Sequence, residues 1–367
     1  MAPTFLKEFK FLFNRLPFYV IFYPTSKCNA SCPHCFNYQR QQEASLKEEL
    51  SLDEIEKISK NFGHIKVLVI SGGEPFLRDD LAEIVSVFYK NNRIQYISFH
   101  TNAFLTKKVV DTVGNVLDKF KDLGVIVCIS IDGIKDGHDR FRGVKGGFDK
   151  ILETIDGLKK LKDKFKNLNL ITSTIFSHST IDSFADTIRF IQNNIGSVKP
   201  SLAFIRGDVK DKEEKVIDYI RYRDFYRNFK YQVDNNISPF SSLALKEALE
   251  MVVNKIVVDN YVDKKQTVPC QAGRKLLVIY ENGDVYPCEI LGHKLGNLRQ
   301  ANYDIKQILF SQRNRTVIEN ISQNKKCYCT WENVTALNLL YSPKFYPMII
   351  REWFRLFVMK TRQAVKR

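Results

Sequence analysis

The feature that most constrains the fold is an alternation of short apolar segments with helix-like segments. Continuous apolar runs are typical of strands that are buried on both faces, as in a parallel sheet covered by helices. Such runs lie at 18–23, 67–70, 96–99, 125–131, 168–175 and 202–205, and helix-like patterns at 52–62, 79–89, 148–161 and 181–192. Repeated βα units favour right-handed crossovers, and six of them fit an α/β fold, a partial, open (β/α)6 barrel.

Length and composition limit the class of protein. A chain of 367 residues suggests two or three domains, and 44% hydrophobic residues exclude a wholly disordered chain. No apolar run reaches the roughly 18–20 residues of a membrane span. Charged residues at 7, 8 and 10 interrupt the apolar residues near the N-terminus, so we expect no secretory leader and a cytoplasmic location. Without export, the eight cysteines indicate metal or redox use.

Three of the cysteines lie in one short segment after the first predicted strand. Cys28, Cys32 and Cys35 have the spacing C-x3-C-x2-C. Thiolates select zinc, copper(I) or iron–sulfur clusters, and a zinc knuckle would normally offer four ligands. Three cysteines can instead hold three irons of a [4Fe–4S] cluster and leave the fourth iron open to a ligand.

This triplet closely resembles the signature of the radical S-adenosylmethionine (radical SAM) enzymes, and the resemblance covers roughly residues 18–333. It implies that the open iron chelates the amino and carboxylate groups of SAM. It also implies that one-electron reduction cleaves SAM to a 5′-deoxyadenosyl radical, which abstracts hydrogen from the substrate. A donor such as flavodoxin or ferredoxin would supply the electron.

The resemblance also implies residues that contact SAM. Gly72, Gly73, Glu74 and Pro75 resemble the family's GGEP motif, which meets the SAM amino group, although a strand-to-helix turn would also use Gly-Gly. Further candidates lie at predicted strand ends or in the cysteine segment: Thr101 and Asn102 for the ribose, Ser130 and Asp132 in a comparable position, Ser173 near the carboxylate, and His34 near the adenine. Arg142 and Arg206 either bind a carboxylate or form surface ion pairs.

Four later cysteines form a second group: Cys270, Cys288, Cys327 and Cys329. The first two belong to a C-x12-G-x4-C pattern whose residues 275–286 predict a β-hairpin with a glycine turn. The pattern resembles the SPASM-type auxiliary-cluster extension in its shortened, single-cluster "twitch" version, so it implies one auxiliary [4Fe–4S] cluster. A structural zinc site is the alternative. Cys128 lies in a predicted strand and is expected to be an inert buried thiol.

A fully ligated auxiliary cluster can accept an electron from a substrate radical. We therefore expect the enzyme to oxidise or rearrange a polyol, sugar or lipid-linked group. The base that such an oxidation needs is undecided among Arg142, Asp139, His138 and Tyr280. Two alternatives are a peptide-modifying maturase and a zinc-binding, non-enzymatic module. No RNA-binding motif is present, so no nucleic-acid partner is expected.

The net charge of +15 is concentrated at the ends of the chain. Near the C-terminus, Arg351, Arg355 and Arg362 share one side of a predicted helix, and its other positions are largely apolar. Such basic amphipathic segments suit the inner face of an anionic membrane, or they dock on the barrel. The predicted domains are an N-terminal amphipathic segment, 1–17; the radical SAM core, 18–206; a helical connector, 207–265; a small α+β auxiliary-cluster domain, 266–333; and a basic amphipathic tail, 334–367.

Overall fold

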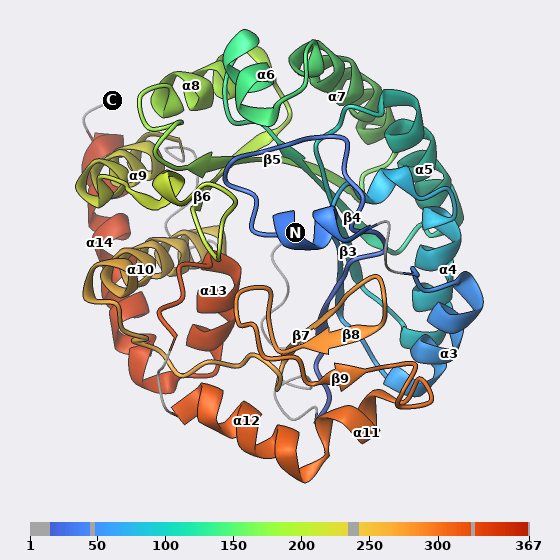
Figure 1. Cartoon of the computed structure of the whole chain (residues 1–367). Helices are drawn as coiled ribbons and strands as arrows, with labels where there is room; N and C mark the ends of the chain where they lie inside the picture. The colour runs from blue at the N-terminus through green and yellow to red at the C-terminus, as the bar shows by residue number, and fades with distance from the viewer. Residues whose placement is uncertain (1–14, 45–47, 234–241, 324–326, 366–367) are drawn as a thin grey trace. The chain divides into compact units, whose positions relative to one another are not determined.

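The computed structural model describes residues 15–44, 48–233, 242–323 and 327–365, which form two compact units (Figure 1). The barrel unit comprises Arg15–Val216 and Gly273–Ile318. The helical unit comprises Ile217–Ala272 and Glu319–Arg367, as far as these are described. Most of the predicted N-terminal amphipathic segment lies outside the described residues, and the predicted domain boundaries stay a prediction.

The barrel unit is built on six parallel strands, each next to the one that precedes it in the chain. The apolar runs of the sequence form these strands: β1 (Tyr19–Phe22), β2 (Val67–Ile70), β3 (Tyr96–Thr101), β4 (Gly124–Ser130), β5 (Leu168–Phe176) and β6 (Lys199–Phe204). Every neighbouring pair is parallel, so all six carboxyl ends lie at the same edge. This is the predicted α/β fold, a partial, open (β/α)6 barrel.

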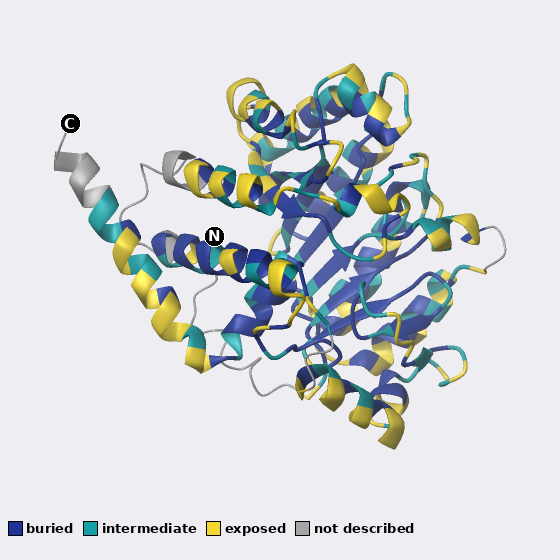
Figure 2. Cartoon of the chain, turned by 60° about the vertical axis from the view of Figure 1, so that its left-hand side comes forward, coloured by how far each residue is buried: buried dark blue, intermediate teal, exposed yellow. Residues whose placement is uncertain are grey.

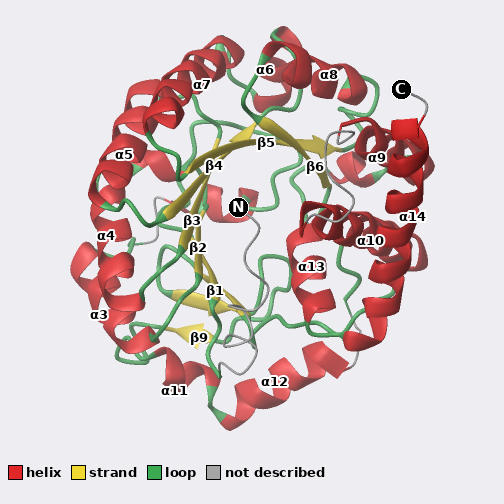
Figure 3. Ribbon diagram, turned by 180° about the vertical axis from the view of Figure 1, so that it is seen from behind, coloured by secondary structure: helices red, strands yellow, loops and turns green. Residues whose placement is uncertain are grey.

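Helices cover the outer face of this curved sheet (Figure 3). They are α3 (Leu52–Phe62), α4 (Leu81–Asn92), α5 (Thr106–Lys119), α6 (Asp136–Arg142), α7 (Gly147–Lys164) and α8 (Phe184–Asn194). Phe22 of β1 packs against Phe88 of α4, with ring centroids 5.8 Å apart. Because side chains alternate along a strand, Tyr19 and Tyr23 point to the opposite, inner face of the barrel. In Figure 2 the strands are almost entirely buried, while the outer helices expose one side.

A hairpin from the C-terminal half of the chain continues the same sheet. β7 (Leu276–Ile279) pairs in parallel with β1, and β8 (Asp284–Tyr286) pairs antiparallel with β7. Gly283 forms the turn with φ +85°, a backbone conformation that residues with a side chain rarely adopt. The predicted hairpin with a glycine turn is therefore confirmed. A short β9 (Gly296–Asn297) and the helix α11 (Ile305–Leu309) follow it.

The helical unit consists largely of four helices: α9 (Tyr219–Val233), α10 (Ser242–Asp263), α13 (Glu332–Leu340) and α14 (Tyr346–Val365). α10 packs against each of the other three. α12 (Gln312–Gln323) spans the sequence boundary between the two units. Among the described residues, no helix has both the length and the apolar character that crossing a bilayer requires.

Candidate active site

The cysteine triplet lies in the loop that follows β1, at the carboxyl edge of the barrel sheet. Cys32 is buried, and Cys28 and Cys35 are half-buried. The amide of Cys35 donates to the carbonyl of Cys32 at 3.3 Å, which turns the loop back on itself. Burial raises the pKa of the Cys28 thiol to about 12 and that of Cys35 to about 11, so an iron cluster that binds thiolates here displaces protons.

The segment Gly72-Gly73-Glu74 after β2 fixes the start of this loop. The amide of Gly73 donates to the carbonyl of Thr25 at 3.0 Å, and the amide of Glu74 donates to that of Lys27 at 2.8 Å. A Cβ atom on Gly73 would lie 2.0 Å from the Lys27 carbonyl oxygen, so only glycine fits this approach. The GGEP segment and the cysteine loop are therefore one backbone assembly.

The Glu74 side chain is held by the end of the next strand. Its Oε1 accepts from the Thr101 hydroxyl at 2.8 Å, and its Oε2 accepts from the Asn102 amide at 2.7 Å. Asn102 in turn donates to Asn29 of the cysteine loop at 2.7 Å. Burial raises the pKa of Glu74 to about 7, although these hydrogen bonds oppose the rise. The arrangement gives a buried carboxylate with a fixed orientation beside the cysteine loop.

Arg142 and Asp132 form a buried ion pair that also contacts the cysteine loop, so Arg142 is not in a surface ion pair. The Arg142 Nε donates to Asp132 Oδ2 at 2.8 Å, and Nη2 donates to the same oxygen. Nη1 lies 3.5 Å from the sulfur of Cys32, and the Arg142 carbonyl accepts from the amide of Ser31 at 2.9 Å. Burial is the largest single effect and opposes the charged form of Asp132, but the Arg142 guanidinium, His34, His138 and the Ile175 amide together outweigh it and lower the pKa of Asp132 below its usual value. Arg142 thus contacts the cysteine loop through both its backbone and its side chain.

The remaining predicted SAM contacts lie at the same edge. Ser130 of β4 and Ser173 of β5 are register partners, so they lie side by side. His34 is buried and stacks on Phe141, with ring centroids 4.9 Å apart, and its Nδ1 has no hydrogen-bond partner among the described residues. Burial lowers the pKa of His34 to about 4, so its ring is neutral near pH 7. The structure brings the predicted residues of this site together on one sheet edge.

Sequence reasoning missed a polar cluster that forms next to this edge. The Tyr23 hydroxyl donates to Glu289 Oε1 at 2.6 Å, and Arg206 Nη2 lies 3.4 Å from Glu289 Oε2. Tyr280 packs on Tyr23 at 4.7 Å between ring centroids, and the Arg40 guanidinium lies 3.6 Å from the centre of the Tyr280 ring. Burial and the Glu289 charge raise the pKa of Tyr23 well above its usual value. The sequence had indicated Arg206 and Tyr280 as separate candidates, but its only signal for Glu289 was the position of this residue directly after Cys288.

Two of the base candidates taken from the sequence accept hydrogen bonds from backbone amides of the barrel unit. His138 Nδ1 accepts from the Asp132 amide at 3.2 Å. Asp139 accepts from the amides of Gly146 and Phe148 at 2.5 and 2.8 Å. Both side chains therefore support the loop around α6.

The four late cysteines belong to different units. Cys270, Cys327 and Cys329 lie in the helical unit, whereas Cys288 lies in the barrel unit. Nearby amides point at three of their sulfurs: Ala272 at Cys270 (3.5 Å), Leu291 at Cys288 (3.3 Å) and Trp331 at Cys329 (3.4 Å). Amide hydrogen bonds to sulfur stabilise thiolates and tune iron–sulfur clusters. Among the described residues, no three His, Cys, Asp or Glu side chains converge as a single-ion site would require.

Comparisons with known proteins agree with this geometry. Residues 22–191 match the family model of the radical SAM superfamily, and residues 270–330 match that of an iron–sulfur cluster-binding domain, SPASM. The AdoMet-dependent heme synthase of Methanosarcina barkeri is 25% identical over 76% of this chain and 78% of its own length. A protein described as a probable GTP 3′,8-cyclase from Methanococcus maripaludis is 32% identical over 57% of this chain and 71% of its own length.

A solved structure shows the same fold. Native anSMEcpe with bound AdoMet and Cp18Cys peptide has a TM-score of 0.56 at 19% identity, covering 94% of this chain and 99% of that one. The chain therefore belongs to the radical SAM superfamily, as an enzyme that uses S-adenosylmethionine and a [4Fe–4S] cluster and that carries a SPASM-type iron–sulfur cluster-binding domain.

Proposed function

We propose that this enzyme oxidises or rearranges a polyol, sugar or lipid-linked group inside the barrel. Cys28, Cys32 and Cys35 hold the cluster that binds SAM, and the four late cysteines hold an auxiliary [4Fe–4S] cluster that accepts an electron. When bound, these groups supply a 5′-deoxyadenosyl radical that removes a hydrogen atom from the substrate, and they take up the electron that remains.

The residues of the barrel edge fit these cofactors. Three thiols lie in one loop, which suits a cluster with one open iron. Gly72 and Gly73 leave backbone exposed where a Cβ would collide with the loop, and Glu74 adds a buried negative charge that suits an ammonium group. In this proposal Thr101, Asn102, Ser130, Ser173 and His34 contact SAM. Asp132 acts on SAM only indirectly, because its carboxylate accepts hydrogen bonds from Arg142 and from the amide of Ile175.

The observation that supports an oxidation is the polar cluster around Glu289. Oxidation of an alcohol carbon releases the hydroxyl proton as well as a hydrogen atom and an electron, so a proton acceptor is needed. Glu289 is a carboxylate oriented by Tyr23 and Arg206, with only 4% of its side chain exposed. We therefore assign Glu289 as that proton acceptor, in place of the candidates taken from the sequence.

Peptide modification is the second candidate. It is favoured by the fold shared with anSMEcpe, a structure that contains a bound peptide. The AdoMet-dependent heme synthase relative favours a small molecule instead. In either case the starting electron comes from a donor such as flavodoxin or ferredoxin, and the reaction takes place in the cytoplasm.

Substrate-dependent formation of 5′-deoxyadenosine tests the proposal. The reconstituted enzyme is incubated anaerobically with SAM, dithionite and separate panels of polyols, amino sugars, lipid-linked sugars and peptides. We expect formation above background with a hydroxyl-bearing small molecule and none with peptides. A response to peptides alone would support the maturase instead.

Glu289→Gln then tests the proton acceptor. With the responding substrate, we expect oxidised product to fall about 100-fold while 5′-deoxyadenosine still forms, because hydrogen abstraction precedes the proton transfer. Asp139→Asn is the matched control, because Asp139 holds a loop through backbone amides. Product formation unchanged in Glu289→Gln would remove Glu289 from the mechanism.

A further inference from the structure

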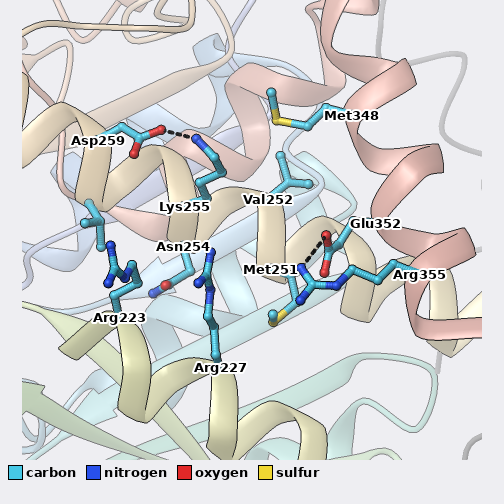
Figure 4. A pocket seen from close by; sticks show the side chains of 11 residues that line it. Arg223, Arg227, Met251, Val252, Asn254, Lys255, Asp259, Met348, Glu352 and Arg355 are labelled. Carbon is cyan, nitrogen blue, oxygen red and sulfur yellow. Dashed lines mark hydrogen bonds and ion pairs between the residues drawn. The ribbon is translucent and has the colours of Figure 1, made fainter. Parts of the chain in front are cut away.

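Two features of the structure have no part in the function proposed above. One is a cavity of about 170 Å³ among α9, α10 and α14 of the helical unit (Figure 4). Its carboxylates pair with its own cations, Lys255 with Asp259 at 2.5 Å and Arg355 with Glu352 at 3.8 Å, so its lining favours no single class of ligand. The other is the short helix α2 (Tyr38–Gln42), which follows the cysteine loop in the barrel unit and directs a side chain at one of its sulfurs.

Gln41 of α2 donates a hydrogen bond to the sulfur of Cys35. The distance from its Nε2 to the Cys35 Sγ is 3.4 Å. In the described part of the chain, the Gln41 carboxamide has no other hydrogen-bond partner. Burial raises the pKa of the Cys35 thiol, and hydrogen bonds from the Asn37 amide and from Gln41 oppose that rise because they favour the thiolate. Gln41 therefore places an N–H dipole beside a sulfur that carries negative charge when it binds iron.

The neighbouring residue, Arg40, fixes the position of α2. This helix has only five residues and none of them is buried, so its own packing cannot hold it in place. The Arg40 guanidinium lies 3.6 Å from the centre of the Tyr280 ring, and its Nη1 lies 3.3 Å from Glu281 Oε1. Glu281 is buried, so solvent screens this ion pair little. The hairpin of β7 and β8 thus anchors α2, and the Gln41 carboxamide keeps its orientation toward Cys35.

The other two sulfurs of the triplet have donors of a different kind. Cys32 lies 3.5 Å from Arg142 Nη1, but Arg142 also binds a buried carboxylate, which its removal would leave without a counter-ion. Cys28 receives a hydrogen bond from the backbone amide of Ala30, which a change of side chain does not remove. Gln41, in contrast, is a neutral side-chain donor that can be removed without disturbing a buried charge.

We propose that the hydrogen bond from Gln41 to Cys35 raises the reduction potential of the SAM-binding cluster. In the reduction, one electron passes from dithionite, or from a donor such as flavodoxin or ferredoxin, to the cluster, and no proton is transferred. The reduced cluster carries one more negative charge, so an N–H dipole directed at a ligand sulfur stabilises it more than the oxidised cluster. The inference rests on the proposed assignment of Cys35 to this cluster and does not depend on the substrate.

A potentiometric titration followed by EPR spectroscopy tests this inference. The full-length, reconstituted enzyme is titrated with dithionite, and the SAM-binding cluster is identified as the signal that changes shape when SAM is added. In Gln41→Leu, which removes the donor, the equilibrium constant for reduction should fall about tenfold, a shift of about 59 mV to lower potential. Gln41→Glu keeps the shape of the side chain but replaces the N–H group by a negative charge, so it should lower the potential further.

Gln39→Leu is the matched control, because Gln39 lies on the same helix, is exposed, and donates to the Tyr38 hydroxyl instead of a cysteine. It should keep the parent's potential, and all three variants should keep the parent's iron content. A SAM-responsive signal with the parent's potential in both Gln41 variants would overturn this inference alone. Loss of iron in both Gln41 variants would overturn it in favour of a purely structural role. A parent without any SAM-responsive signal would overturn the assignment of the cysteine triplet, and this inference with it.

Discussion

At the scale of single residues, the barrel edge depends on side chains that do not themselves need to touch a cofactor. Arg142 links Asp132 to the sulfur of Cys32, and both charged partners are buried. The sequence indicated Arg142 as a candidate to bind a carboxylate but could not say which one. Asp132 is the carboxylate that Arg142 binds, because the tertiary structure brings α6 against the end of β4 and the loop after β1.

Arg142→Gln is therefore expected to be costly. It leaves the Asp132 carboxylate buried without its counter-ion, which should lower the free energy of unfolding by about 3 kcal/mol, as measured by urea denaturation. Arg189→Gln is the control, because Arg189 and Asp186 form an ion pair that is 67% and 63% exposed. That change should cost less than about 1 kcal/mol. Similar losses of unfolding free energy in the two variants would show that the buried Arg142–Asp132 pair stabilises the fold no more than an exposed ion pair does.

Glu74 should make SAM binding depend on pH. Its pKa in the folded chain, about 7, lies above the ordinary 4.5. The folded chain therefore binds more protons than the unfolded chain between these values, and the contribution of Glu74 to stability is lost as the pH rises through that window.

An ammonium group on SAM needs the carboxylate form of Glu74. The dissociation constant for SAM should therefore rise roughly tenfold when the pH falls from about 8 to about 6, as the carboxylate becomes protonated. Glu74→Gln should bind weakly at both pH values, with no such change. A parental affinity that does not vary with pH would count against an ion pair between Glu74 and SAM.

At the scale of elements, the apolar runs and helix-like patterns of the sequence were sufficient for much of the fold. The six strands and the hairpin were predicted, and Ser51 and Glu54 form both hydrogen bonds of a capping box at the start of α3. α5 and α6 were not predicted. The pairing of β7 with β1 was also missed, because residues far apart in the sequence make it.

Gly73 tests how closely two elements approach at this edge. In Gly73→Ala the new Cβ would meet the carbonyl oxygens of Lys27 and Ser26 at 2.0 and 2.6 Å, and backbone atoms cannot move aside as a flexible side chain can. We expect the cysteine loop to shift and the iron content after reconstitution to fall by about four per chain. Gly137→Ala is the control, because nothing lies within 4 Å of its Cβ position. Full iron content in Gly73→Ala would mean that the loop tolerates displacement.

At the scale of the whole molecule, eight cysteines divide into a triplet, a group of four and Cys128. The sequence predicted this division from spacing alone. It could not predict that Cys288 and its neighbour Glu289 belong to the barrel unit, while the other three late cysteines belong to the helical unit. Position in the sequence does not reveal which unit each cysteine belongs to, because the chain leaves the barrel unit after Val216 and returns to it at Gly273.

Single alanine variants separate the roles of the three groups. The parent should contain about eight irons per chain after anaerobic reconstitution. Cys32→Ala should abolish 5′-deoxyadenosine formation, because the SAM-binding cluster loses a ligand. Cys288→Ala should lose about four irons and the oxidised product but retain SAM cleavage. Cys128→Ala is the control: burial raises the pKa of this thiol to about 12, so it is inert, and iron content and SAM cleavage should stay at parental levels. A parent that holds about four irons together with zinc would show instead that the late cysteines form a structural zinc site.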